Sequence, residues 1–234
     1  RYMWDMLHGD LGLSYKNSIS VWDQVIGRFP NTCVLAVAGI LVALLIGIPV
    51  GIISAKKQYS LIDNVSMVFA LIGVAMPNFW FGLLAVIVFS LTLGWLPSQG
   101  MGEGLVPLLR SIVLPALTLG TGCAATVTRM TRSSMLEVIR QDYISTARAK
   151  GLSEKTVTYR HMLRNALIPI ITATGLQFGS LLGGAMLTET IFSWPGLGRL
   201  MVDAIKSKDI PLVLGSIIFM ATTFSIVNLV VDII

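Results

Sequence analysis

The stretch from Phe29 to Ala55, FPNTCVLAVAGILVALLIGIPVGIISA, runs for 27 residues without an aspartate, glutamate, lysine or arginine. A helix needs about 20 consecutive apolar residues to cross the hydrocarbon core of a bilayer. Four further stretches also lack these charges: 64–102, 111–128, 165–188 and 210–231. Together the five stretches cover more than half of the 234 residues. The sequence therefore predicts an all-α, polytopic membrane helix bundle with about five spans.

Composition excludes several other classes of protein. Apolar residues make up 54% of the chain and charged residues only 12%, against about 25% charged in an ordinary soluble domain. Cys33 and Cys123 both lie in charge-free stretches, which is typical of small buried hydrophobic residues rather than of disulfides. The two histidines, His8 and His161, are too far apart in sequence to indicate a metal site. The net charge of +5 does not indicate nucleic-acid binding, because the basic residues gather beside the apolar stretches.

The positions of the basic residues predict the topology. Lys56 and Lys57 directly follow the first span, and the segment 129–164 carries eight basic residues against three acidic ones. The positive-inside rule places both segments in the cytoplasm, so an even number of spans must separate them. The 39-residue stretch 64–102 is therefore expected to form one long helix, kinked at Pro77. The expected spans lie at about 31–54, 66–94, 111–128, 166–188 and 210–232.

This topology gives the expected domain organisation. Residues 1–30 form an extracytoplasmic segment, and residues 31–234 form one transmembrane domain with a cytoplasmic loop at 129–165. The first residue is Arg1 rather than methionine. If the natural N-terminus is cytoplasmic, we expect at least one earlier span to precede this segment.

The basic loop shows signs of ordered structure. Residues 133–139 are expected to continue the third span as a helix. Asp142 suits the N-terminus of a short helix, Lys150 suits its C-terminus, and Gly151 suits a left-handed stop. Ser153 can cap a further helix that extends to Arg164. The result is a short basic helix between two sharp corners. It could lie in a groove on another protein, or the segment could be an ordinary solvated loop.

At this point the residues resemble a known family. The run TARAKGLS (146–153), followed by RNALIP (164–169), is similar to the cytoplasmic "EAA" signature of ABC importer permeases, in the form found in the dipeptide/oligopeptide/nickel subfamily. Ser145, Thr146 and Ala147 stand where the general signature has Glu-Ala-Ala, and the gap from Gly151 to Pro169 is longer than usual. Both departures resemble the peptide/nickel branch. Further matches are GDLGLS (9–14), PNFWFG (77–82), LPAL (114–117), RMTRSSM (129–135), ETIFSWPGLG (189–198) and NLVVD (228–232).

The resemblance implies a type I ABC importer transmembrane domain in a multi-pass protein of a bacterial or archaeal plasma (inner) membrane. It implies that the chain imports di- or oligopeptides, forms half of a pore with a second homologous permease, and works with two cytoplasmic ATP-binding subunits and an extracytoplasmic substrate-binding protein. ATP and magnesium would be bound by the partner ATPase, with no cofactor, metal or catalytic residue in this chain. The residues that match the family's ATPase-docking segment are Asp142, Tyr143, Thr146, Ala147, Arg148, Ala149, Lys150 and Gly151.

Two alternatives stay open at this stage. Within the same family, the substrate could be nickel, a metal chelate or glutathione. Outside it, the chain could be an ion-coupled secondary transporter, although no span carries a central carboxylate or histidine that would bind a proton. The chain also lacks a phosphate-binding Gly-x-x-x-x-Gly-Lys-Ser/Thr loop, so ATP hydrolysis would require another polypeptide.

The fourth span and its outer end contain the candidate residues for the translocation path or for helix packing. Gly175, Gly179 and Gly183 recur every four residues, which leaves one helix face without side chains and suits either static packing or a sliding interface. Thr172, Thr174 and Gln177 are polar at membrane depth and could face a water-filled path or bond neighbouring helices. Glu189, at the outer end, could be functional, solvated or locally paired.

Overall fold

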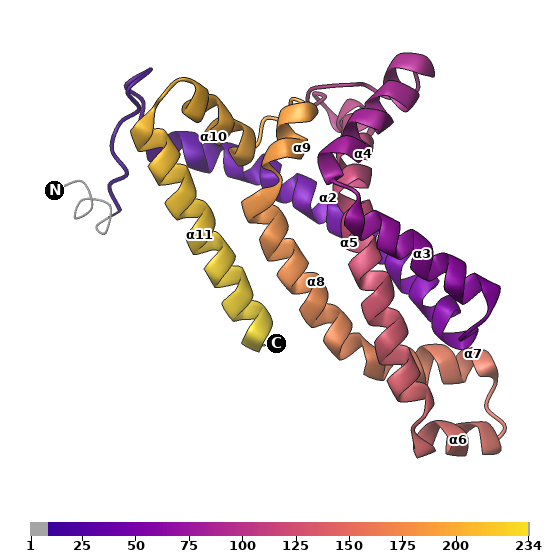
Figure 1. Cartoon of the computed structure of the whole chain (residues 1–234). Coiled ribbons are helices and arrows are strands. Elements are labelled where there is room, and N and C mark those ends of the chain that lie inside the picture. Colours follow the sequence, from indigo (N-terminus) through magenta and orange to yellow (C-terminus); the bar gives the residue numbers. More distant parts are fainter. Residues whose placement is uncertain (1–8, 234) are drawn as a thin grey trace.

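The computed structural model describes residues 9–233. The part of the expected extracytoplasmic segment that comprises residues 1–8, including His8, lies outside the described residues. Within the described part the chain is helical apart from turns, loops and an isolated antiparallel bridge between Leu13 and Ser20 (Figure 1). In chain order the helices are α2 (Val21–Lys56), α3 (Leu61–Ala75), α4 (Asn78–Ala85), the π-helix η1 (Val86–Thr92), α5 (Leu105–Ile139), α6 (Asp142–Ala149), α7 (Glu154–Thr156), the π-helix η2 (Val157–Leu163), α8 (Arg164–Gly184), α9 (Met186–Ile191), α10 (Leu197–Lys206) and α11 (Ile210–Ile233).

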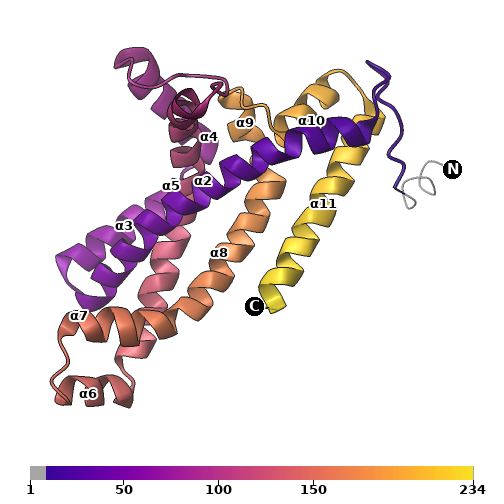
Figure 2. The same ribbon diagram turned by 180° about the vertical axis from the view of Figure 1, so that it is seen from behind.

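Four continuous helices are long and apolar enough to cross a membrane: α2, α5, the helix formed by α7, η2 and α8, and α11. The bent pair formed by α3 with α4 and η1 meets the same criteria when its parts are taken together, which gives a fifth candidate span. Figure 2 shows α2 running diagonally across α5 and α8. The all-α class and the prediction of about five spans are confirmed.

Both basic segments lie at the same end of the bundle, as the charge distribution predicts. The end of α2, at Lys56, and the turn before α3, which begins at Lys57, lie beside α6 and α7 in both views (Figures 1 and 2). Lys56 is close enough to Glu154 for its charge to act on that carboxylate. The loop after η1 and the helices α9 and α10 lie at the opposite end.

The prediction of one kinked helix over 66–94 is wrong in its geometry. The chain breaks at Met76 and Pro77 into two helices bent by 99°. Proline lacks a backbone N–H and disfavours helical geometry at the residue before it, and Met76 is accordingly extended (φ −79°, ψ 125°). Asn78 then begins a new helix, with Pro77 at its N-cap.

The first long helix begins at Val21, ten residues before the expected start of its span at about 31. Val21 and Val25 are fully buried, in a cluster with Leu11 and residues of α10 and α11. The ring of Phe29 packs edge-on against Phe219, with centroids 5.0 Å apart. Tertiary packing at the outer end therefore extends the helix beyond the charge-free stretch.

The most extensive contact between two helices in the bundle is that of α2 with α5. A Cβ added to Gly51 would lie 2.5 Å from the Cβ of Thr131, and a Cβ added to Gly120 would lie 2.6 Å from that of Val42. Glycines let two membrane helices approach until their backbones are almost in contact. These glycines hold α2 and α5 together as the centre of the fold.

We expect Gly51→Ala to lower the stability of the detergent-solubilised protein by about 1–3 kcal/mol, because the added methyl group overpacks the α2–α5 contact. Gly27→Ala is the matched control on the same helix, since nothing lies within 4 Å of its Cβ position. Thermal unfolding should show a clear loss for the first variant and none for the second. Equal transition temperatures would mean that the two helices are not in contact at Gly51.

Candidate functional site

The sequence-predicted short helix exists as α6, at the end of the bundle (Figure 1). The chain turns sharply on both sides of it. Gln141 is extended before it (φ −79°, ψ 142°), and Gly151 adopts a left-handed φ of +78° after it. Ser153 then caps the next helix, its Oγ accepting a hydrogen bond from the backbone N–H of Thr156 at 3.3 Å. The predicted left-handed stop at Gly151 and the predicted helix cap at Ser153 are confirmed.

One face of α6 is packed against the spans. Ile144 and Ala147 are buried in the same cluster as Met135 of α5 and Met162 of η2. Ala147 was expected on the surface that meets a partner, and the structure instead places it against this chain's own core. Spacing of three residues along the helix puts Ala147 on the same face as Ile144. Through this face α6 packs against η2, and residues 140 and 141 connect it along the chain to α5.

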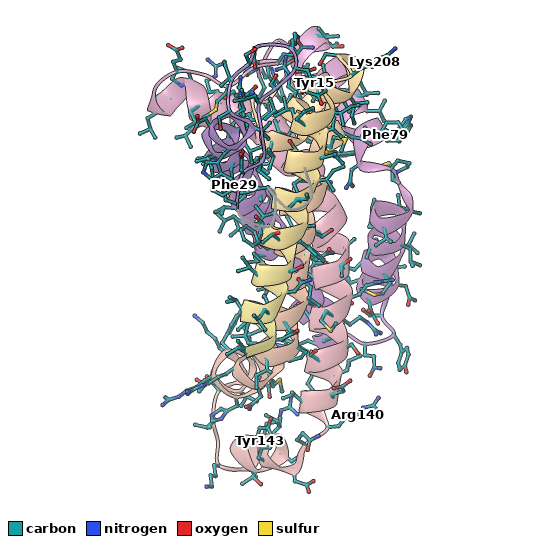
Figure 3. All side chains as sticks on the ribbon, turned by 90° about the vertical axis from the view of Figure 1, so that its left-hand side faces the viewer. Tyr15, Phe29, Phe79, Arg140, Tyr143 and Lys208 are labelled. Carbon is teal, nitrogen blue, oxygen red and sulfur yellow. The ribbon has the colours of Figure 1, made fainter. Side chains whose placement is uncertain are left out.

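Two polar contacts also tie α6 to the chain that follows it. The side-chain amide of Asn165, at the start of α8, donates a hydrogen bond to the hydroxyl of Tyr143 at 3.0 Å. Arg148 Nε lies 2.8 Å from Glu154 Oε1, so this cation already has a partner within the loop. The remaining sequence-predicted docking residues are exposed along α6 and its C-terminal turn: Asp142, Tyr143, Thr146, Arg148, Ala149, Lys150 and Gly151. Figure 3 shows Tyr143 at this end, far from Tyr15 and Lys208.

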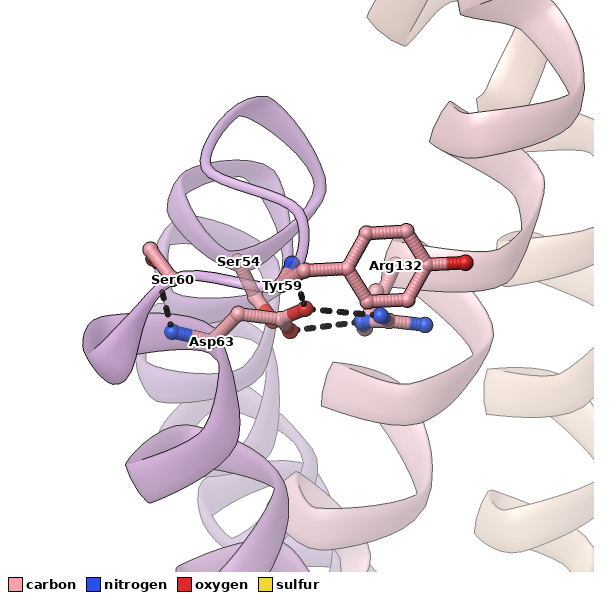
Figure 4. A network of polar contacts seen from close by, with 5 residues as sticks. All are labelled: Ser54, Tyr59, Ser60, Asp63 and Arg132. Carbon is pink, nitrogen blue, oxygen red and sulfur yellow. Dashed lines mark hydrogen bonds and ion pairs between the residues drawn. The ribbon is translucent and has the colours of Figure 1, made fainter.

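A buried ion pair just above this end was not predicted from the sequence. Asp63 of α3 is 2% exposed and receives two hydrogen bonds of 2.7 Å from Arg132 Nε and Nη2 of α5 (Figure 4). The hydroxyl of Ser54 and the backbone N–H of Tyr59 also donate to this carboxylate. Because Ser54 lies on α2, the pair joins three helices. We name Ser54, Tyr59, Asp63 and Arg132 the inner clamp.

Glu189, one of the candidate residues, is completely buried at the other end. Thr32 Oγ1 donates to Glu189 Oε1 at 2.7 Å, and the backbone N–H of Arg199 donates to Glu189 Oε2 at 3.0 Å. Since Arg199 lies in the first turn of α10, the carboxylate satisfies free N–H groups there. Of the three possibilities left open for Glu189, the structure shows local pairing, which fixes the 194–199 loop to α2.

The segment after residue 9 is fixed to the same outer end through Asp209. Burial of this carboxyl raises its pKa, but hydrogen bonds from the hydroxyl of Ser14 and the backbone N–H of Tyr15 outweigh it. The pKa of Asp209 is therefore held below its usual range. This contact connects the N-terminal loop to the start of α11.

Two glycines of the predicted stripe on α8 face α11. A Cβ on Gly175 would collide with Val231, and one on Gly179 would lie 3.1 Å from Asn228 Oδ1, whereas the Cβ position of Gly183 meets nothing within 4 Å. The structure therefore brings Gly175 and Gly179 into a helix contact but not Gly183.

The two threonines of α8 bond to their own helix. Thr172 and Thr174 donate to the carbonyls of Ile168 and Ile170, at 3.2 and 2.7 Å. Neither hydroxyl bridges to a neighbouring helix in this arrangement.

Gln177 lies apart from these contacts, in a cavity of about 390 Å³ beside the α3–α4 break. The other polar side chains that line it are Asn78, Thr126, Ser180 and Thr188. Asn78 belongs to a motif quoted from the sequence, but only the break at Pro77 brings it to α5 and α8. Phe79, the residue after Asn78, lies toward the outer end of the molecule (Figure 3).

Comparison with known proteins identifies the family. The model of the family "Binding-protein-dependent transport system inner membrane component" matches residues 47–234. The chain is 43% identical to the dipeptide transport system permease protein DppB of Escherichia coli K12, over 99% of this chain and 76% of that protein. It is 42% identical to the glutathione transport system permease protein GsiC of E. coli O6:H1, over 99% of this chain and 74% of that protein.

Solved structures show the same fold. An inward-facing structure of the MetNI methionine ABC transporter matches with a TM-score of 0.72 and 18% identity, over 89% of this chain and 93% of that one. With a short helix held between the spans at one end and relatives that match the whole chain, the chain belongs to the family of inner-membrane permease components of binding-protein-dependent ABC importers.

Proposed function

We propose that this permease takes up di- or oligopeptides as half of a translocation path, with a second homologous permease as the other half. The relatives named for dipeptide transport, at 43% identity over nearly the whole chain, support this substrate class. The glutathione permease, at 42% identity, keeps a short thiol-bearing peptide as the second candidate. Family membership leaves the ion-coupled secondary transporter without support.

The coupling role rests on the attachment of α6. Two cytoplasmic ATP-binding subunits would dock against the exposed residues of α6 and its C-terminal turn, and they, not this chain, would bind ATP and magnesium. α6 packs against η2 and is hydrogen-bonded to α8 through Tyr143 and Asn165, and only residues 140 and 141 separate it from α5. A displacement of α6 by a docked subunit would therefore move two spans together. This double attachment is the single observation that carries the mechanism.

The outer end would receive the extracytoplasmic substrate-binding protein. It presents a small polar pocket of about 160 Å³ whose charged residues are Arg28, Arg199 and Asp203. The loop behind this pocket is fixed by Glu189, as described above. A rigid charged surface suits a partner that docks and leaves repeatedly, because rim charges mainly affect association rates.

Uptake into proteoliposomes tests this function. The permease, co-purified with its partner subunits, is reconstituted with ATP in the lumen and the binding protein outside. We expect alanyl-alanine to accumulate only with both ATP and binding protein, and vesicles loaded with ADP serve as the control. Uptake driven by a proton gradient without ATP would contradict the assignment. Uptake of glutathione but not of alanyl-alanine would make glutathione, the second candidate, the substrate.

A further inference from the structure

The cavity beside the α3–α4 break is lined by polar side chains that come from several different helices. Asn78 reaches it from α4, Gln177 and Ser180 from α8, and Thr126 from α5. Asn78 and Ser180 are exposed and Gln177 is half-buried in this chain. The cavity is therefore accessible, and its volume of about 390 Å³ lies within the range of about 300–1,000 Å³ that is typical of small-molecule sites.

Its two amide side chains have no partner within the described chain. Among residues 9–233, neither Asn78 nor Gln177 makes a side-chain hydrogen bond, whereas Thr172 and Thr174 on the same α8 bond to their own helix. A Cβ on Gly122 would lie 2.6 Å from Asn78 Oδ1, so the glycine makes room for this amide. Amide groups that lack both water and a partner are costly at membrane depth. In this accessible cavity their donors and acceptors are free to pair with water or with a polar molecule that enters it.

The chemistry of the lining restricts that occupant. Every residue that lines the cavity comes from a stretch without aspartate, glutamate, lysine or arginine. Amide and hydroxyl side chains offer both hydrogen-bond donors and acceptors. They match the N–H and C=O groups of a peptide bond, which are the same in every peptide. The absence of charge here avoids selecting for or against any charged side chain.

We infer that this cavity is a peptide subsite, in which Gln177 and Asn78 hydrogen-bond to the backbone amide of the peptide during its passage. The inference rests on the proposed function, since it assumes that peptides are the cargo. It assigns to this chain a neutral, sequence-tolerant contact with the substrate. The rival occupant is a side chain of the second permease.

Charge substitution at Gln177 distinguishes a peptide in the cavity from a side chain of the second permease. In the reconstituted importer, uptake of alanyl-alanine, alanyl-glutamate and alanyl-lysine is measured for the wild-type chain, Gln177→Lys and Gln177→Glu. The contribution of the binding protein cancels when each variant is normalised to the wild type. If the peptide passes within about 4 Å of residue 177, Gln177→Lys should favour the glutamate peptide over the lysine peptide by about fivefold or more. Gln177→Glu should reverse this preference.

Gln24→Lys and Gln24→Glu are the matched controls. Gln24 lies near the outer end of α2 and bonds to Asn17, so it carries the same change of charge outside the cavity. These variants should keep the wild-type ratio of the three peptides. If Gln177→Lys does not reach the membrane, Ser180→Lys on the same wall should show the same preference.

The possible results distinguish a failure of the peptide subsite from a failure of the proposed function. Unchanged peptide ratios in the Gln177 and Ser180 variants, with peptide uptake intact, would overturn the subsite and leave the proposed function standing. That result would also fit a cavity filled by the second permease. If the wild-type importer hydrolyses ATP but moves none of the three peptides, the proposed function itself fails, and the subsite fails with it.

Discussion

Replacing Gly151 with proline is expected to abolish uptake while leaving the chain inserted in the membrane. Gly151 has a φ of +78°, and the proline ring fixes φ near −65°. The backbone N–H of Gly151 also donates to the carbonyl of Arg148 at 2.9 Å, and proline has no such donor. The corner after α6 would be lost, and with it the surface that we assign to the ATPase. ATP-dependent uptake in proteoliposomes measures the effect.

Gly151→Asn is the control for this experiment. Asparagine enters the left-handed region far more readily than other residues with a side chain and keeps the backbone donor, so most of the uptake should remain. Membrane insertion is checked for both variants by extraction and size-exclusion chromatography. Normal transport by Gly151→Pro would contradict the coupling role of the loop.

The second large effect is expected at the inner clamp. Arg132→Met leaves the carboxylate of Asp63, which is only 2% exposed, without its cationic partner. Breaking a buried ion pair in this way costs about 3–5 kcal/mol. We expect a large fall in the thermal stability of the solubilised protein, because α2, α3 and α5 are all joined at this point. Asp63→Asn should cost less, since Arg132 is 22% exposed and can reach water.

A double variant distinguishes the cost of leaving one buried charge unpaired from the general cost of substituting these residues. In Asp63→Leu/Arg132→Met no buried charge remains, and replacement of both partners by apolar groups is often close to neutral. It should be more stable than Arg132→Met alone. Arg148→Met, which breaks the exposed pair with Glu154, is the matched control and should barely change stability. If all of these variants showed the same small change in thermal stability, the inner clamp would not contribute to stability.

The sequence was informative where the determinants are local. Stretches without charge reveal the spans, and the positions of Lys56, Lys57 and the segment 129–164 reveal which ends lie together. The short helix could be predicted because Asp142, Gly151 and Ser153 specify its ends through neighbouring residues alone. The break at Pro77 was located, but its 99° angle also depends on how α4 packs against α5 and α9.

The remaining features depend on residues far apart in the chain. Asp63 and Arg132 are separated by 69 positions, and neither residue is distinctive in sequence. The glycine spacing on α8 was visible, whereas the contact at Gly51 and Gly120 requires knowledge of which helices cross. The burial of Glu189 could not be anticipated either, because its partners Thr32 and Arg199 come from separate helices. The polar cavity is likewise assembled only after the α3–α4 break brings Asn78 to α8.

The central claim is that this permease works only with a separate ATPase. Gentle extraction of the tagged full-length chain from its native membrane, followed by mass spectrometry of what co-purifies, tests it most directly. We predict one further permease and two ATP-binding subunits in stoichiometric amounts. A chain that purifies alone and still moves solute in vesicles without ATP would contradict the account.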